Sequence, residues 1–191
     1  GGIMRIEDRT AVTVGRSVSM SKSKRNVVDP EEIIESYGAD TARLFMLSDS
    51  PPERDLEWSD TGIKGAWRFL GTLWRMVEEL GTVASVPAAS GGEGASDMQR
   101  SIHSAIAGVT GDLEKFHFNR AVARIRQLTN ELAEGVRKTP DEQMTYRVGL
   151  EIVLRLLAPM TPHICAELWS RLGRDEKLFA MPWPEADEKY L

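Results

Sequence analysis

The chain has 191 residues and a formal net charge of −5, with 41% hydrophobic and 28% charged residues. This composition is typical of a globular protein with a real core, and no apolar run approaches the ~20 residues that span a bilayer. Cys165 is the single cysteine, so an internal disulfide is excluded and a reducing compartment is favoured. We therefore expect a cytoplasmic protein with no membrane partner.

The N-terminal part predicts a short β hairpin followed by a basic loop. Within residues 3–14, apolar and polar residues alternate near the end, where Val12 and Val14 flank a threonine, and residues 7–9 are turn-like. Residues 15–28 then hold four cationic and no acidic residues, although the whole chain is acidic. In this loop Lys22 stands between two serines, an arrangement suited to phosphate oxygens. A solvated basic loop or a phosphorylation site is the alternative.

The rest of the chain predicts helices. Residues 29–32 carry a capping aspartate, a proline at the first helical position and a glutamate three residues after the cap. A second short helix is expected over about residues 40–48, and apolar residues spaced by three and four predict longer ones. These longer helices are expected to begin near residues 59, 96, 119, 139 and 161. The fourth of them is apolar nearly all round over residues 150–158, which indicates a central position. The fold class is therefore mainly α, a helical bundle preceded by a short β hairpin and the loop.

The basic loop resembles a known signature. Residues 20–23 (Met-Ser-Lys-Ser) look like the KMSKS motif of class I aminoacyl-tRNA synthetases, and residues 24–30 and 37–43 are similar to the segments on the C-terminal side of that motif in the family. The resemblance implies that Lys22 stabilises ATP phosphates in the transition state, with Mg²⁺ accompanying ATP as substrate and no metal site in this chain. Ser19 replaces the family's first lysine. The residues that the resemblance assigns to ATP binding are Ser19, Met20, Ser21, Lys22 and Ser23.

Further blocks narrow the resemblance. Residues 50–53, 56–59 and 68–75 look like bacterial leucyl-tRNA synthetases. Residues 118–121, 157–164 and 167–169 are similar to the helical anticodon-binding-type domain that the leucine, isoleucine, valine and methionine enzymes share. The resemblance implies activation of leucine with ATP and transfer to tRNA(Leu). A fragment of an isoleucyl-, valyl- or methionyl-tRNA synthetase, or a non-catalytic helical RNA-binding module, remains an alternative.

The sequence contains no HIGH-type motif, no nucleotide-binding parallel sheet and no insertion that resembles an editing domain. We therefore expect a monomeric C-terminal part of a larger synthetase that is inactive alone. The expected segments are the tail end of a catalytic region, a connecting region of short helices, a tRNA-binding bundle with a flexible linker at 81–95, and the start of a link to an absent C-terminal domain. Their boundaries are 1–28, 29–58, 59–186 and 187–191.

Two basic helix faces are candidates for tRNA contacts. Lys64, Arg68 and Arg75 are spaced by four and seven, so we expect them to share a face that follows backbone phosphates. Arg120 and Arg124 form a second pair at a spacing of four. A solvated polar face is the alternative interpretation for both sets.

The remaining candidates are interpreted as structural. Trp67 and Trp74 are expected to pack between helices, with base stacking as the alternative. Cys165 falls on an apolar stripe and is expected to be inert packing. The three histidines match no zinc-site spacing.

Overall fold

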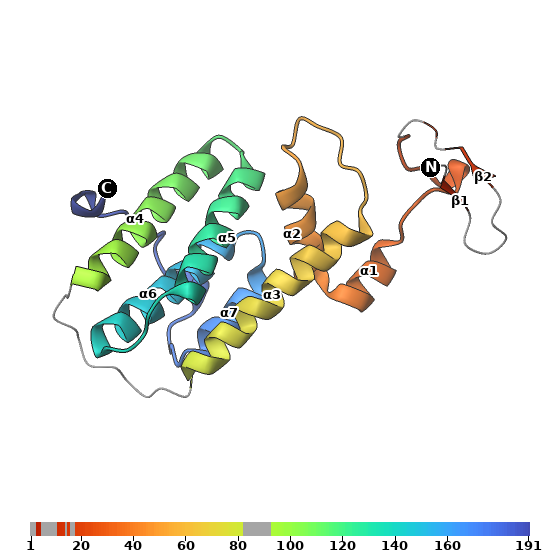
Figure 1. Ribbon diagram of the computed structural model, residues 1–191. Coiled ribbons are helices and arrows are strands. Elements are labelled where there is room, and N and C mark those ends of the chain that lie inside the picture. The colour runs from red at the N-terminus through yellow and green to blue at the C-terminus, as the bar shows by residue number, and fades with distance from the viewer. Residues whose placement is uncertain (1–2, 5–10, 14, 16–17, 82–92) are drawn as a thin grey trace. The chain divides into compact units, whose positions relative to one another are not determined.

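The computed structural model describes residues 3–4, 11–13, 15, 18–81 and 93–191 (Figure 1). The chain divides into two compact units, residues 1–32 and 33–191. None of the helices within the described ranges is both long and apolar enough to cross a bilayer.

The first unit contains a short pair of strands and the basic loop. Strands β1 (Ile3–Met4) and β2 (Ala11–Val12) pair antiparallel, with Ile3 opposite Val12. Residues 5–10 of the expected hairpin lie outside the described residues. The loop contains a 3₁₀ turn, η1 (Lys22–Lys24), and α1 (Pro30–Tyr37) begins at the end of this unit. Asp29 Oδ1 accepts a hydrogen bond from Glu31 N at 2.9 Å, so the predicted capping role of Asp29 is confirmed.

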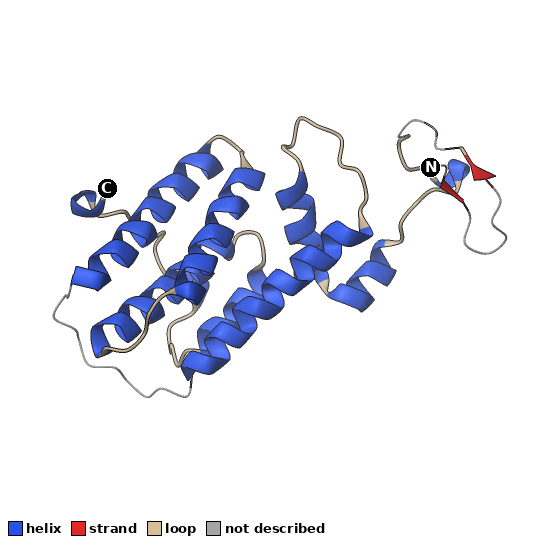
Figure 2. Cartoon of the chain, viewed as in Figure 1, coloured by secondary structure: helices blue, strands red, loops and turns tan. Residues whose placement is uncertain are grey.

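The second unit is a helical bundle, as predicted, and helices dominate the described chain (Figure 2). Its elements are α2 (Ala39–Asp49), α3 (Asp60–Gly81), α4 (Glu93–Glu114), α5 (Phe118–Glu134), α6 (Pro140–Leu157), α7 (Pro162–Arg171), η2 (Leu178–Ala180) and η3 (Glu188–Tyr190).

Helix α6 forms the centre of this bundle, which confirms the prediction from its apolar run. It packs against α4, α5 and α7 (Figure 1), and Leu150, Leu154 and Leu157 are fully buried. Burying a leucine side chain contributes roughly 1.5–3 kcal/mol. The helix begins with a capping box, in which Thr139 Oγ1 accepts from Glu142 N at 3.2 Å and Glu142 Oε2 accepts from Thr139 N at 2.9 Å.

Several helix boundaries differ from the prediction. Helix α5 was expected to begin near residue 119 and begins at Phe118, with His117 at its N-cap. The chain reverses just before it through Phe116, whose φ of 58° is left-handed, a conformation that sequence patterns rarely reveal outside glycine and asparagine. The same helix ends at Glu134, so Val136 lies outside it and is exposed.

The expected linker at 81–95 is shorter than predicted at its C-terminal end. Helix α4 begins at Glu93, earlier than the expected start at residue 96, so the last residues of that stretch are helical. Residues 82–92, the rest of the expected linker, lie outside the described residues.

The C-terminal segment lies along α4. Trp183 Nε1 donates to Thr110 Oγ1 at 2.8 Å, and Asp187 N donates to His103 Nδ1 at 3.0 Å. Tyr190 stacks on the His103 ring, with the ring centroids 4.8 Å apart. Residues 182–191 are therefore part of the described bundle surface.

Candidate functional site

The basic loop is folded on itself by short-range hydrogen bonds. Ser21 Oγ accepts from Lys24 N at 3.3 Å, and Asn26 Oδ1 accepts from Ser21 N at 2.8 Å. The carbonyl of Ser19 accepts from Asn26 Nδ2 at 3.4 Å and from Lys24 Nζ at 3.5 Å. The Asn26 amide thus closes the loop by joining its two sides, and the 3₁₀ turn is held within this ring.

The turn presents a cluster of cations and hydroxyls. Lys22, Lys24 and Arg25 are all exposed, and the hydroxyls of Ser21 and Ser23 lie 3.2 Å apart. Arg25 ends the turn with a left-handed φ of 53° and donates its N–H to Lys22 O at 3.2 Å. Lys24 reaches back to the loop's own backbone, whereas the exposed ammonium of Lys22 has no hydrogen bond to another described residue. Lys22 is therefore the cation best placed to approach an anion.

The basic face of α3 is present as predicted. Lys64, Arg68 and Arg75 are exposed on one side of the helix. Arg68 Nε donates to the carbonyl of Lys64 at 3.3 Å, and Arg75 Nη2 donates to Thr72 Oγ1 at 3.2 Å. Within the described ranges, neither Lys64 nor Arg68 forms an ion pair. Their role toward RNA stays a prediction.

The arginines of α5 have a different environment. Arg124 Nε lies 2.7 Å from Asp112 Oδ2, and Arg120 Nε lies 3.5 Å from Asp112 Oδ1. Asp112 is buried in α4, and a Cβ added at Gly108 would lie only 2.8 Å from Arg124 Cδ. The glycine thus lets the Arg124 side chain cross α4 to reach the carboxylate. The carboxylate of Asp112 thus offsets part of the positive charge of Arg120 and Arg124, and these ion pairs join α4 to α5.

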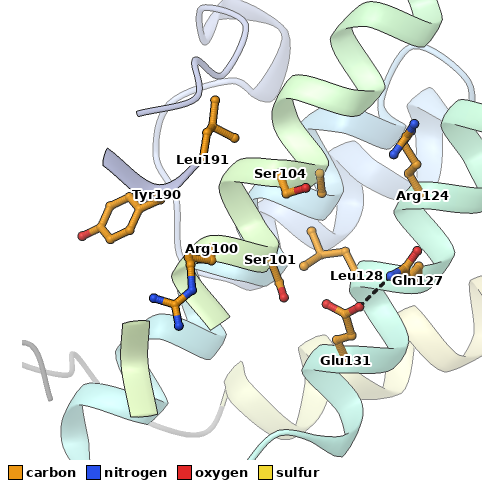
Figure 3. Close-up of a pocket in the computed structure, with 10 residues that line it drawn as sticks. Arg100, Ser101, Ser104, Arg124, Gln127, Leu128, Glu131, Tyr190 and Leu191 are labelled. Carbon is orange, nitrogen blue, oxygen red and sulfur yellow. Dashed lines mark hydrogen bonds between the residues drawn. The ribbon is translucent and has the colours of Figure 1, made fainter. Parts of the chain in front are cut away.

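A cavity of about 390 Å³ lies between α4, α5 and the C-terminal residues (Figure 3). Arg100 and Arg124 contribute cations to its lining, but Glu131 contributes a carboxylate. Gln127 Nε2 donates to Glu131 Oε1 at 2.9 Å along the α5 wall. The lining therefore has mixed charge and does not specify an anion.

The expectation that Trp67 packs between helices is wrong. Its side chain is 54% exposed, because the buried stripe of α3 runs through Ile63, Ala66 and Leu70 and leaves Trp67 beside it. Trp74 is half-buried as expected, and the guanidinium of Arg171 lies 4.4 Å from its ring centroid. The spacing of seven did not reveal which tryptophan faces solvent.

The contact between Asp40 and α7 was not predicted from the sequence. Asp40, buried at the start of α2, accepts from Ile164 N at 2.7 Å and lies 2.9 Å from His163 Nδ1. The sequence separation between Asp40 and Ile164 is 124 residues, so no local pattern connects them. Cys165 is buried as predicted, and burial raises the pKa of its thiol to about 12.

Comparisons with known families define the class of protein and then the family. Residues 10–59, which include the basic loop, match the model described as tRNA synthetases class I (I, L, M and V). Residues 96–191, which are 96 of the 191 residues, match the model described as the anticodon-binding domain of tRNA ligase. The chain therefore belongs to the family of anticodon-binding domains of tRNA ligases.

Individual relatives are homologous over nearly the whole chain. It is 55% identical to a leucine–tRNA ligase of Rhodospirillum rubrum, over 97% of this chain and 22% of the relative. It is 51% identical to that of Paramagnetospirillum magneticum, over 100% of this chain and 22% of the relative. A solved Agrobacterium radiobacter LeuRS, in a ternary complex with tRNA and LeuAMS, matches 90% of this chain and 23% of its own with a TM-score of 0.79 and 31% identity. The chain thus spans about a fifth of the length of these relatives.

Proposed function

We propose that this chain supplies an ATP-phosphate-binding loop and a tRNA-binding helical domain to a leucine–tRNA ligase. The observation that carries the proposal is the self-closed turn around Lys22, in a chain homologous to leucine–tRNA ligases. Class I synthetases use ATP, so the cations of the turn have a triphosphate to bind. The alternative of an isoleucine, valine or methionine enzyme receives less support, because the similar ligases of R. rubrum and P. magneticum carry the leucine name.

The turn suits the activation step of this reaction. A leucine carboxylate oxygen attacks the α-phosphorus of ATP, the bond to the bridging oxygen breaks, and pyrophosphate leaves. Negative charge grows on the leaving phosphates, and Lys22 stands in an exposed cationic turn that can neutralise it. Ser19, Met20, Ser21 and Ser23 complete the proposed contacts with ATP. A hydroxyl at the 3′ end of tRNA(Leu) then attacks the carbonyl carbon of the leucyl-adenylate, and AMP leaves.

The helical segments would hold the tRNA. In this proposal residues 1–28 end a catalytic region, 29–58 connect it to the bundle, and 59–186 bind tRNA(Leu) by backbone and shape. Residues 187–191 begin a link to a further domain, and the enzyme acts as a monomer. The contacts come from Lys64, Arg68 and Arg75, with a smaller share from Arg120 and Arg124 because Asp112 offsets their charge.

Leucine-dependent exchange of pyrophosphate into ATP, measured on the full-length protein that contains this chain, tests the loop. Lys22→Ala is expected to lower kcat about 100- to 1,000-fold, as when a preorganised transition-state donor is lost. Lys24→Ala is the matched control, because it removes the same charge from the same turn, and it should cost less than tenfold. An equal loss of kcat in the two variants would show that Lys22 contributes only general positive charge and no specific transition-state contact.

Two further measurements separate the alternatives. The 191-residue chain alone is expected to give no leucine-dependent exchange of pyrophosphate into ATP. Detectable exchange would contradict the proposal that this chain supplies only the phosphate-binding loop of the active site. Charging of tRNA by the full-length protein with leucine, isoleucine, valine and methionine in turn should succeed with leucine only. A full-length protein that binds tRNA but charges no amino acid would favour the non-catalytic RNA-binding module.

A further inference from the structure

A groove of about 500 Å³ lies between the start of α2, the middle of α3 and the first turn of α7. Helix α3 lines it with Trp67, Leu70 and Trp74, and α7 contributes His163 and Ile164. Its lining is mainly apolar, and its volume falls within the range of about 300–1,000 Å³ that small-ligand sites occupy. The groove is thus large enough for a flat aromatic ring.

Asp40 fixes a polar group at the edge of this groove. Its carboxylate accepts from Ile164 N at 2.7 Å and lies 2.9 Å from His163 Nδ1. Because an ionised carboxylate only accepts hydrogen bonds, the Nδ1 atom of His163 donates to Asp40, and Nε2 lies on the opposite edge of the ring. The His163 side chain is 78% exposed, so this edge of the ring is open to a ligand.

Trp67 offers an uncovered aromatic face beside the groove. Its side chain is 54% exposed. Gly71 lies one turn further along the helix, where even an added Cβ would meet nothing within 4 Å. The neighbouring Trp74, in contrast, is covered in part by the guanidinium of Arg171. Trp67 is therefore available for stacking.

Cations flank this aromatic face on its solvent side. With about 3.6 residues per turn, Lys64, Arg68 and Arg75 project within roughly a third of a turn of Trp67. The acidic residues Asp60 and Glu78 stand at the two ends of this stretch, and Arg171 pairs with Glu78 at 3.3 Å. An apolar aromatic slot beside a row of cations is complementary to a base attached to a phosphate backbone.

We propose that this groove captures one unpaired nucleobase of an RNA, which stacks on Trp67. Lys64 and Arg68 hold the phosphates on either side of that nucleotide. The imidazole edge of His163 that carries Nε2 forms a hydrogen bond with the edge of the base. The inference rests on the proposed function, since it names the part of an RNA ligand that this surface would recognise.

Binding of RNA hairpins to the 191-residue chain tests this site. One hairpin carries a single bulged 2-aminopurine in its stem, and a second has a fully paired stem and the same compact tetraloop. Trp67→Ala is expected to weaken binding of the bulged hairpin about 5- to 150-fold, as stacking losses of one base predict. It should leave the affinity for the paired hairpin unchanged, and Trp67→Phe should restore most of the loss.

The matched control is Trp183→Ala, which removes another partly exposed tryptophan, 37% exposed, from outside the groove. This variant should bind both hairpins as the wild type does. Quenching of 2-aminopurine fluorescence on binding should occur with the wild type and disappear in Trp67→Ala. Far-UV circular dichroism and thermal unfolding verify that each variant is folded.

The outcomes separate this inference from the proposed function. If the wild type binds tRNA(Leu) but Trp67→Ala changes neither hairpin, the groove inference is overturned and the proposed function stands. The groove inference is also overturned if Trp67→Ala weakens binding of both hairpins equally. It is overturned as well if the groove binds a protein segment and no RNA. If the wild type does not bind tRNA(Leu), the groove inference and the tRNA-binding part of the proposed function are both overturned.

Discussion

Replacing Asp40 with alanine is expected to loosen the join between α2 and α7. The substitution removes the acceptor of the Ile164 N–H bond, 2.7 Å long, and of the contact to His163 at 2.9 Å. Loss of a helix-capping carboxylate costs about 0.5–2 kcal/mol, and a buried N–H left without a partner costs about 1–3 kcal/mol. The two estimates overlap, because both include the hydrogen bond from Ile164 N. We therefore expect the free energy of unfolding to fall by about 2–3 kcal/mol.

Equilibrium unfolding in urea, followed by far-UV circular dichroism, measures this loss directly. At about 2–4 °C per kcal/mol for a chain of this size, the melting temperature should fall by about 4–12 °C. The slope of the free energy of unfolding against urea should stay unchanged, because the fold and the surface exposed on unfolding are the same.

Two control variants identify the hydrogen bond as the cause. Asp40→Asn keeps an oxygen that can accept from Ile164 N, so its cost should be about 1 kcal/mol or less. His163→Ala should cost less than about 1 kcal/mol, because that side chain is 78% exposed. The reasoning is refuted if Asp40→Ala unfolds within about 0.5 kcal/mol of the wild type, or if Asp40→Asn loses as much as Asp40→Ala.

Three further predictions concern other contacts of the bundle. Backbone N–H groups at the start of α6 lower the pKa of Glu142, so its contribution is present above the unfolded pKa of about 4.3 and is lost as pH falls through the lower folded value. Melting temperatures measured between about pH 5 and pH 3 should therefore fall less in Glu142→Gln than in the wild type. The Cys165 thiol, with its pKa raised to about 12, should resist alkylation by iodoacetamide in the native protein and react only when urea unfolds it. Arg124→Ala should lower the free energy of unfolding by about 1 kcal/mol, measured in urea, because Asp112 loses its closer partner.

The helices could be predicted because their signals are local. The capping box of Thr139 and Glu142 and the proline that opens α7 each mark a start within a few residues of sequence. The start of α5 was predicted to within one residue, but the chain reversal before it was not, because Phe116 turns left-handed without a glycine. The exposure of Trp67 was not predicted, because residue spacing shows the period of a helix but not the boundary of its buried stripe.

The candidate site divides in the same way. The charge and hydroxyls of the basic loop are visible in composition, and its resemblance to a signature motif points to Lys22. The closure of the loop by Asn26 is not visible, since it depends on one amide that reaches Ser19 and Ser21 at once. The groove beside Trp67 is still less visible, because it is assembled by Asp40 and Ile164 from opposite ends of the bundle's sequence.

The distribution of charge bears on the proposed binding of RNA, because the chain as a whole is acidic. A net charge of −5 repels a polyanion on average, so binding requires cations gathered where carboxylates do not offset them. The two basic faces differ in this respect, because Asp112 neutralises part of the Arg120 and Arg124 charge. Lys64 and Arg68 have no such partner within the described residues. Phosphate contacts, and with them the dependence of affinity on salt, should therefore concentrate on α3, while the arginines of α5 mainly hold the bundle together.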